Sequence, residues 1–187
     1  MWRRAREWVA KYGVVPLLIA VLVGAGGVVA GNAALEWTNT ESFCISCHEM
    51  KDNAYAEYKE TIHDQNRSGK RATCPDCHVP KEFFAKIWRK TVATKELYYH
   101  LTGKLDTPEK YEEHRYEMAL NEWKRLKAND SRECRNCHDQ NAMSEDKQTP
   151  ETVDRHTKGF AEGKTCIDCH FAIAHFEPDG ELAPEDL

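Results

Sequence analysis

Eight cysteines constrain this chain more than any other feature, because they occur as four pairs with the same internal spacing. A histidine directly follows each pair, and no cysteine is left over. The four motifs are Cys44-Ile45-Ser46-Cys47-His48, Cys74-Pro75-Asp76-Cys77-His78, Cys134-Arg135-Asn136-Cys137-His138 and Cys166-Ile167-Asp168-Cys169-His170. Two thiols at this spacing can bond the two vinyl groups of one porphyrin, and the adjacent imidazole can bind its iron. The pattern predicts four covalently attached c-type haems.

Three other uses of paired cysteines explain less of this pattern. Zinc sites use paired thiolates, but they need no histidine after each second cysteine. A disulfide framework fits an even cysteine count in an oxidising compartment, yet it gives no reason for the four histidines. A redox dithiol explains one pair and not four.

Composition and charge exclude two further classes. The chain has 187 residues, of which 30% are charged. Its mean hydropathy is −0.73, which rules out a membrane protein with several spans. Nucleic-acid-binding proteins usually carry a positive charge, whereas the net charge of this chain is −5, so no nucleic-acid partner is expected.

The N-terminal region carries a membrane signal. Residues 12–35 contain no charged side chain, while Arg3, Arg4, Arg6 and Lys11 precede them. This length suffices to cross a bilayer, and the basic flank keeps the N-terminus in the cytoplasm. The alternative is a cleaved signal peptide, whose apolar region is usually shorter. We expect a cytoplasmic basic segment over 1–11, a transmembrane anchor helix over 12–35 and a periplasmic tetrahaem domain over 36–187.

The remaining sequence predicts a mainly α fold: one transmembrane helix followed by a small domain of helices and loops, with no significant sheet. The pairs Thr107-Pro108 and Thr149-Pro150 are typical helix starts, and the first should open a long helix through Lys127. Further helices are expected over 81–101 and 52–63. The tail from Glu177 is expected to be exposed.

Four six-coordinate haems need eight axial ligands, and the motif histidines supply four. The other candidates are His63, His100, His114, His156, His175 and Met50. His114 lies in a charged sequence, which favours a solvated side chain. His63, His156 and His175 are the preferred ligands, whereas His100 is as consistent with burial in an aromatic cluster. Met50 could ligate or simply pack.

The chain resembles the NapC/NirT/NrfH family of tetrahaem quinol dehydrogenases, from the anchor to about His175. The resemblance rests on the N-terminal anchor, on Glu49-Met50 after the first motif, on the three later motifs, and on Glu60-Thr61-Ile62-His63, Asn66-Arg67-Ser68-Gly69, Val79-Pro80, Lys127-Ala128-Asn129-Asp130 and Glu162-Gly163-Lys164-Thr165.

This resemblance implies a function in anaerobic respiration. Family members take electrons from membrane quinol and pass them through their haems to a periplasmic reductase. The implied location is the inner membrane, with its lipid as a partner. The implied acceptor is nitrate reductase or its small cytochrome subunit.

The resemblance also implies residue roles. His63, His156 and His175 match distal ligands, and in some relatives the equivalent of Met50 ligates the first haem in place of the motif histidine. Some relatives carry a histidine where this chain has Lys81, which leaves one distal position open. The quinol pocket of the family falls on Lys90 and Glu96.

Two alternatives remain open. One is an anchored relay module that receives electrons from another protein. The other is a terminal reductase with chemistry at an open haem, for which the sequence offers no evident substrate-binding residues. An ordinary solvated helix face is the competing interpretation of Lys90 and Glu96.

Overall fold

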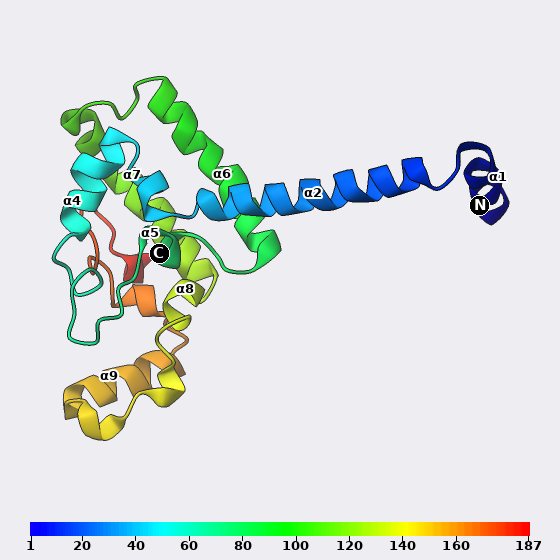
Figure 1. Ribbon diagram of the computed structural model, residues 1–187. Coiled ribbons are helices and arrows are strands. Elements are labelled where there is room, and N and C mark those ends of the chain that lie inside the picture. The colour runs from blue at the N-terminus through cyan, green and yellow to red at the C-terminus, as the bar shows by residue number, and fades with distance from the viewer. The chain divides into compact units, whose positions relative to one another are not determined.

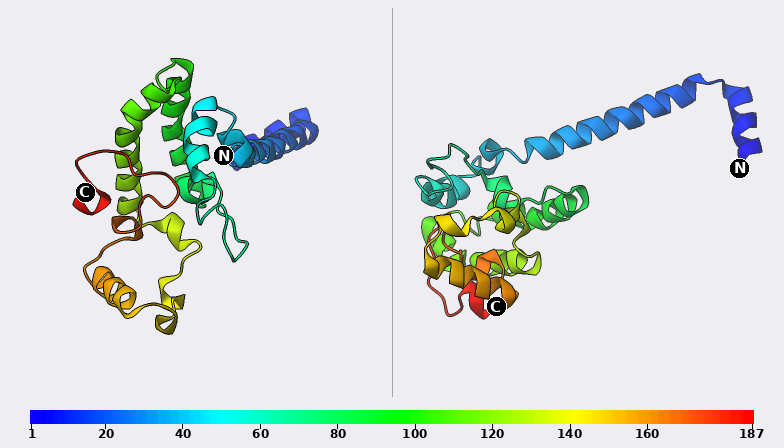
Figure 2. Two further views of the ribbon diagram at one scale, coloured as in Figure 1. Left: turned by 90° about the vertical axis from the view of Figure 1, so that its left-hand side faces the viewer. Right: turned by 90° about the horizontal axis from the view of Figure 1, so that it is seen from below.

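The computed structural model describes residues 1–187, and the chain divides into two units, Met1–Phe43 and Cys44–Leu187. The first unit holds the N-terminal helices α1 (Trp2–Tyr12) and α2 (Val15–Trp37). The short helix α3 (Glu41–Cys44) spans the boundary between the two units. Gly13 separates α1 from α2 with a φ of 75°, a left-handed conformation that favours glycine. Figures 1 and 2 show α2 as one unbroken helix.

Helix α2 is long and apolar enough to cross a membrane, and it is the one helix of the chain that is. None of its 23 residues is buried within the protein. A predominantly apolar and unburied surface of this length is consistent with a single-pass membrane anchor.

The second unit is helical, and neither unit contains a strand, which confirms the predicted fold class. Its α-helices are α4 (Tyr55–Tyr58), α5 (Cys74–His78), α6 (Phe83–Leu101), α7 (Pro108–Ala128), α8 (Arg132–Arg135) and α9 (Pro150–Ala161). A π-helix, η1 (Met50–Ala54), and four 3₁₀ turns complete it: η2 (Gln140–Ala142), η3 (Glu145–Lys147), η4 (Cys166–Asp168) and η5 (Pro184–Asp186). Within this unit, α9 lies at the end opposite the α6–α7 connection (Figures 1 and 2).

The predicted helix starts at Thr107 and Thr149 are confirmed. The Thr107 hydroxyl accepts a hydrogen bond from the Lys110 amide at 3.3 Å, and Thr149 accepts one from Thr152 at the same distance. Each threonine is followed by proline at the first helical position, whose fixed φ suits a helix start. Helix α7 ends at Ala128, one residue beyond the predicted end.

The helix predicted over 52–63 is wrong in its second half, because α4 ends at Tyr58. Lys59 is extended and Glu60 has a φ of 73°. Hydrogen bonds outside a helix hold this loop: the Tyr58 hydroxyl donates to the carbonyl oxygens of His63 and Ala72, and Asp64 accepts from the Glu60 amide at 3.1 Å. These contacts outweigh the local helical preference.

The hydrophobic core is small. Six hydrophobic side chains are buried, and three of them, Trp123, Leu126 and Ile167, form one cluster. A chain of this length normally buries a far larger apolar interior. The tail from Glu177 is mostly exposed, as expected, except that Pro184 is fully buried and Leu187 packs against the cluster. The unit therefore depends on something besides its own side chains for an interior.

Candidate functional site

Each cysteine motif is built on a single tight turn. In the second motif, the Asp76 carboxylate accepts hydrogen bonds from the Thr73 amide at 2.8 Å and the Thr73 hydroxyl at 2.7 Å. Asp168 holds Thr165 in the same way in the fourth motif, at 2.7 and 2.8 Å. The sequence Thr-Cys-x-Asp-Cys-His thus supplies its own helix cap.

The turn places the chemistry of a motif on one side. In the third motif the His138 amide donates to the Cys134 carbonyl at 2.9 Å, and in the fourth His170 donates to Cys166 at 2.8 Å. Residues three and four positions apart share a face of a helical turn. Both sulfurs and the imidazole of a motif therefore face the same volume.

Each motif histidine faces one histidine from elsewhere in the chain. The four pairs, with the separation of their ring centres, are His48 and His100 (6.2 Å), His63 and His138 (6.3 Å), His78 and His175 (6.2 Å), and His156 and His170 (6.0 Å). The ninth histidine, His114, instead places its Nδ1 2.9 Å from the carbonyl oxygen of Lys110 within α7.

These separations fit one iron between each pair. A metal–imidazole bond is about 2 Å long and the ring centre lies roughly 1 Å beyond the nitrogen, so two imidazoles on opposite sides of one metal have centres about 6 Å apart. A pair of cysteine thiols accompanies every imidazole pair. Each site thus offers two thiols for attachment of a porphyrin and two imidazoles for its iron, which are the groups that a haem c with two histidine ligands needs.

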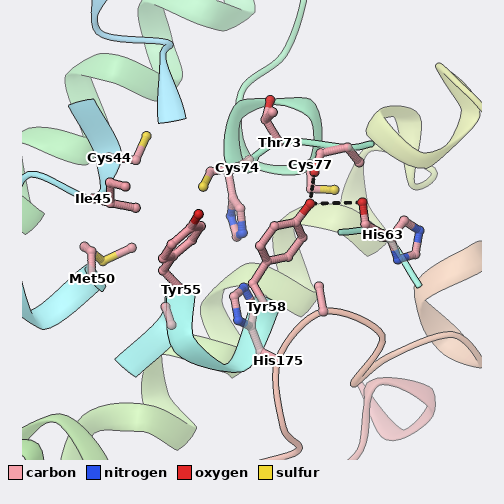
Figure 3. Close-up of a pocket in the computed structure, with 14 residues that line it drawn as sticks. Cys44, Ile45, Met50, Tyr55, Tyr58, His63, Thr73, Cys74, Cys77 and His175 are labelled. Atoms are coloured by element: carbon pink, nitrogen blue, oxygen red, sulfur yellow. Dashed lines mark hydrogen bonds between the residues drawn. The ribbon is translucent and has the colours of Figure 1, made fainter. Parts of the chain in front are cut away.

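The second of these sites is a visible cavity (Figure 3). It is lined by both thiols of the second motif and by the imidazoles of His78 and His175. Tyr55 and Tyr58 of α4 line the same space. An apolar, aromatic wall with a few polar donors is typical of a cofactor pocket.

One imidazole at each of two sites has a pKa that favours its neutral form. Burial, and next the charge of His78, lower the pKa of His175 to about 4. Burial also lowers the pKa of His170, with His156 and His138 acting in the same direction. Neutral imidazole is the form that ligates a metal, so both side chains are ready to bind iron at neutral pH.

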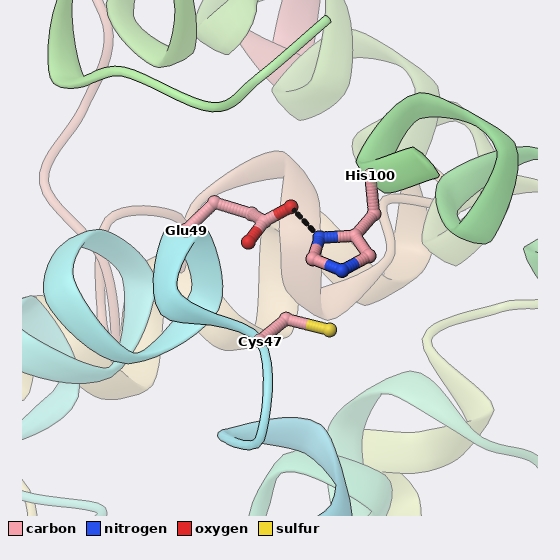
Figure 4. A group of neighbouring side chains, drawn as sticks. All are labelled: Cys47, Glu49 and His100. Carbon is pink, nitrogen blue, oxygen red and sulfur yellow. Dashed lines mark hydrogen bonds and ion pairs between the residues drawn. The ribbon is translucent and has the colours of Figure 1, made fainter. Parts of the chain in front are cut away.

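At the first site the His100 ring is bound by a carboxylate (Figure 4). The Nδ1 of His100 lies 2.5 Å from Oε1 of Glu49, whose side chain is 6% exposed. Burial raises the pKa of Glu49, but hydrogen bonds from its own amide and from His100 outweigh this and lower the pKa below its ordinary value. The Cys47 sulfur lies close to both groups, so the three belong to the first haem site.

The four sites form one continuous series within the unit. Cys44 of the first motif and Cys74 of the second line the same cavity, and the second motif packs on the third through α5 and α8. Cys134 of the third motif forms a thiol–thiol hydrogen bond with Cys166 of the fourth.

His100, which the sequence alone leaves as an open candidate, is the residue that the structure adds to the favoured ligands. His63, His156 and His175 each lie opposite a motif histidine. Met50 is 41% exposed and lines the cavity at the second site, whereas His100 is the group opposite His48. The count of axial ligands could have pointed to His100. If every haem has two histidine ligands, the eight positions require four histidines besides those of the motifs.

The two residues proposed to bind quinol both lie on α6. Glu96 is 66% exposed and its Oε1 lies 3.3 Å from Nη1 of Arg89. Lys90 is partly buried and lies six residues earlier on the same helix. Glu96 precedes His100 by four residues, so these two side chains share a face of the helix.

A chain with four c-type haem motifs, four facing histidine pairs and one apolar N-terminal helix is a tetrahaem cytochrome c. Residues 7–180 match the model of the NapC/NirT cytochrome c family, N-terminal region, and the chain belongs to this family. It is thus an electron-transfer protein that carries covalently bound haem.

Relatives match over nearly their whole length. Cytochrome c-type protein NapC of Haemophilus influenzae is 52% identical over 181 residues, which cover 95% of this chain and 90% of that protein. Denitrification system component NirT of Stutzerimonas stutzeri is 52% identical over 178 residues, with 94% and 88% covered. NapC of Escherichia coli is 48% identical over 181 residues, with 95% and 90% covered. No solved structure matches the chain.

Proposed function

We propose that this protein oxidises membrane quinol and delivers the electrons to a periplasmic reductase. The observation that carries the proposal is the series of four imidazole pairs in one unit, joined in sequence to one apolar helix. Such a series suits transport of electrons away from a membrane donor better than chemistry at a single open site.

The chain's own residues would have two roles, haem attachment and iron ligation. The eight motif cysteines would hold four haems, and the facing histidines would bind their irons. Bound haem supplies one-electron oxidation and reduction. Met50 remains a proposed alternative ligand at the first site.

Quinol oxidation also releases protons, so the site needs a proton acceptor and an orienting donor near the hydroxyl. Lys90 and Glu96 are proposed for these roles. Their position supports this, because α6 also carries His100, the group opposite the first motif histidine. A quinol held by this helix would lie beside the first haem site.

The proposed topology follows from the N-terminal charges. Arg3, Arg4, Arg6 and Lys11 precede the apolar helix, and the positive-inside rule keeps them in the cytoplasm. Residues 1–11 would then be cytoplasmic, 12–35 would span the inner membrane and 36–187 would lie in the periplasm, where covalent haem attachment takes place.

Reduction of the purified protein in liposomes tests the quinol step. We expect menaquinol or ubiquinol to reduce the haems, as followed by the reduced α-band, and a quinol-site inhibitor to block this. Lys90→Leu should slow reduction by quinol at least ten-fold and leave reduction by dithionite intact. Lys124→Leu, the same change at an exposed position on α7, should match the wild type. If neither quinol reduces haems that dithionite reduces, the protein is a relay that receives electrons from another protein.

Nitrate reductase is the proposed acceptor. Relatives with similar identity bear the names NapC and NirT, and the latter is a denitrification component, so the acceptor needs a direct test. The reduced protein should be reoxidised by purified periplasmic nitrate reductase, or its small cytochrome subunit, with nitrate present. Reoxidation by a nitrite reductase alone would reassign the partner.

A further inference from the structure

A partly buried carboxylate of α7 contacts the histidine of the second haem motif. The Nδ1 of His78 lies 2.9 Å from Oε1 of Glu122, and the Glu122 side chain is 21% exposed. Nδ1 is the ring nitrogen that remains available when Nε2 binds a metal. Its proton can therefore be donated to the carboxylate while the ring ligates.

Glu122 cannot swing away from this position, because Arg125 clamps it. Nη2 of Arg125 lies 2.6 Å from Oε1 and Nε lies 3.0 Å from Oε2, a two-point contact within one turn of α7. The same guanidinium donates to the carbonyl oxygen of Cys77 at 2.9 Å. One arginine thus fixes both the carboxylate and the backbone of the motif that carries His78.

The third and fourth sites provide a contrast, whereas at the first site His100 has a carboxylate partner of its own, Glu49. The partner of Nδ1 is uncharged at both the third and the fourth site. For His63 it is the carbonyl oxygen of Ile173 at 3.4 Å, and for His156 it is the amide oxygen of Gln148 at 2.9 Å. The third and fourth sites therefore lack the charge that the second site has on its histidine.

We propose that Glu122 is a positioning residue that holds His78 as the Nδ1–H tautomer, aims Nε2 at the iron and lowers the reduction potential of the second haem. A carboxylate acceptor makes a ligating imidazole more basic and orients it. The negative charge also favours ferric over ferrous iron, since the ferric form carries one more positive charge. The inference rests on the haem ligands alone and does not depend on quinol as donor.

The test is a redox titration of the purified holoprotein with Glu122→Gln, a substitution that keeps the shape and removes the charge. We expect one of the four midpoint potentials to rise by about 59 mV or more, a ten-fold change for a one-electron couple, with the other three unchanged. Glu117→Gln makes the same charge change at an exposed position of the same helix and should leave all four potentials in place.

Two controls separate positioning from a structural role. Haem content should stay at four, and all haems should remain low-spin in the electron paramagnetic resonance (EPR) spectrum. If the glutamine variant does not assemble, Glu122→Asp is titrated instead; it keeps the charge at a longer distance and should give a smaller rise of the same single potential. Four unchanged potentials in an assembled variant, or an equal shift of all four, would overturn the proposal.

Discussion

The hydroxyl of Ser131 accepts a hydrogen bond from the backbone amide of Ile167 at 3.1 Å, in the interior of the haem unit. Ser131 is fully buried, and its left-handed backbone, with a φ of 48°, turns the chain from α7 into the third motif. Ile167 lies inside the fourth motif. One hydroxyl therefore sets the spacing between the last two haem sites.

Ser131→Ala should destabilise the protein by about 1 to 3 kcal/mol, because it leaves a buried amide without an acceptor. For a chain of this size, thermal unfolding followed by circular dichroism should show a melting temperature lower by a few degrees. Ser144→Ala, at an exposed serine, is the matched control and should leave the temperature unchanged. An equal effect of the two substitutions would show that the Ser131 hydroxyl does not hold the motifs together.

Removing the group opposite His48 should change one haem and spare the others. In His100→Ala we expect a high-spin ferric signal in the EPR spectrum from one quarter of the haem, with four haems still attached. The reason is the loss of the sixth ligand at the first site, since no second imidazole lies opposite His48.

His114→Ala is the control, because this ring bonds to its own helix and should leave the spectrum unchanged. Met50→Leu distinguishes the alternative ligand. If the methionine variant acquires the high-spin signal and His100→Ala does not, Met50 is the ligand and the His48–His100 pair is not.

The loop that carries His63 should lose stability in acid. Asp64 is buried between Arg71, at 2.6 Å, and Lys59, at 3.1 Å. Hydrogen bonds from Arg71 and from the Glu60 amide hold the pKa of Asp64 well below its ordinary value. A carboxyl with a lowered folded-state pKa stabilises the protein above its unfolded pKa of about 3.9, and this contribution shrinks as the pH falls below that value.

Melting temperatures of wild type and Asp64→Asn, compared from about pH 7 down to about pH 3.5, measure this contribution. The difference should be largest at neutral pH and should narrow in acid. Asp154→Asn breaks an exposed pair with Lys158 and should have a small effect throughout. A difference between wild type and Asp64→Asn that stays constant with pH would contradict the assignment.

The sequence predicted the parts of this fold that depend on neighbouring residues. Helices α7 and α9 begin where Thr-Pro pairs occur, and helix α6 lies within two residues of its predicted start. These signals work because a cap and a proline act on the backbone next to them.

The features that sequence reasoning missed are tertiary. His100 lies opposite His48 because α6 returns toward the first motif, and no local pattern encodes that return. The helix expected through His63 stops at Tyr58, because the hydroxyl of Tyr58 and the carboxylate of Asp64 bond a loop instead. The one buried residue of the tail is Pro184, whose carbonyl oxygen accepts a hydrogen bond from Lys127 at 3.2 Å.

Arg125 should be the most sensitive charged residue of the unit, because it pairs with two carboxylates, one partly and one fully buried. Its guanidinium lies 2.6 Å from Glu122 and 3.2 Å from Glu133, and the Glu133 side chain is fully buried. Burial raises the pKa of Glu122, but the charge of His78 and hydrogen bonds from His78 and Arg125 outweigh it and hold this pKa well below its usual range. Removing the arginine therefore takes away the guanidinium partner that both carboxylates share.

We expect Arg125→Met to lower the free energy of unfolding by about 3 to 5 kcal/mol, the usual effect of stranding a buried charge. Lys158→Met, which breaks an exposed pair, should change it by less than about 1 kcal/mol. Adding Glu122→Gln to Arg125→Met should recover part of the loss, because the double variant no longer leaves that charge unpaired. Strictly additive losses in this double-mutant cycle would mean that the two side chains are not coupled. Arg125 would then not hold Glu122 in its position beside His78.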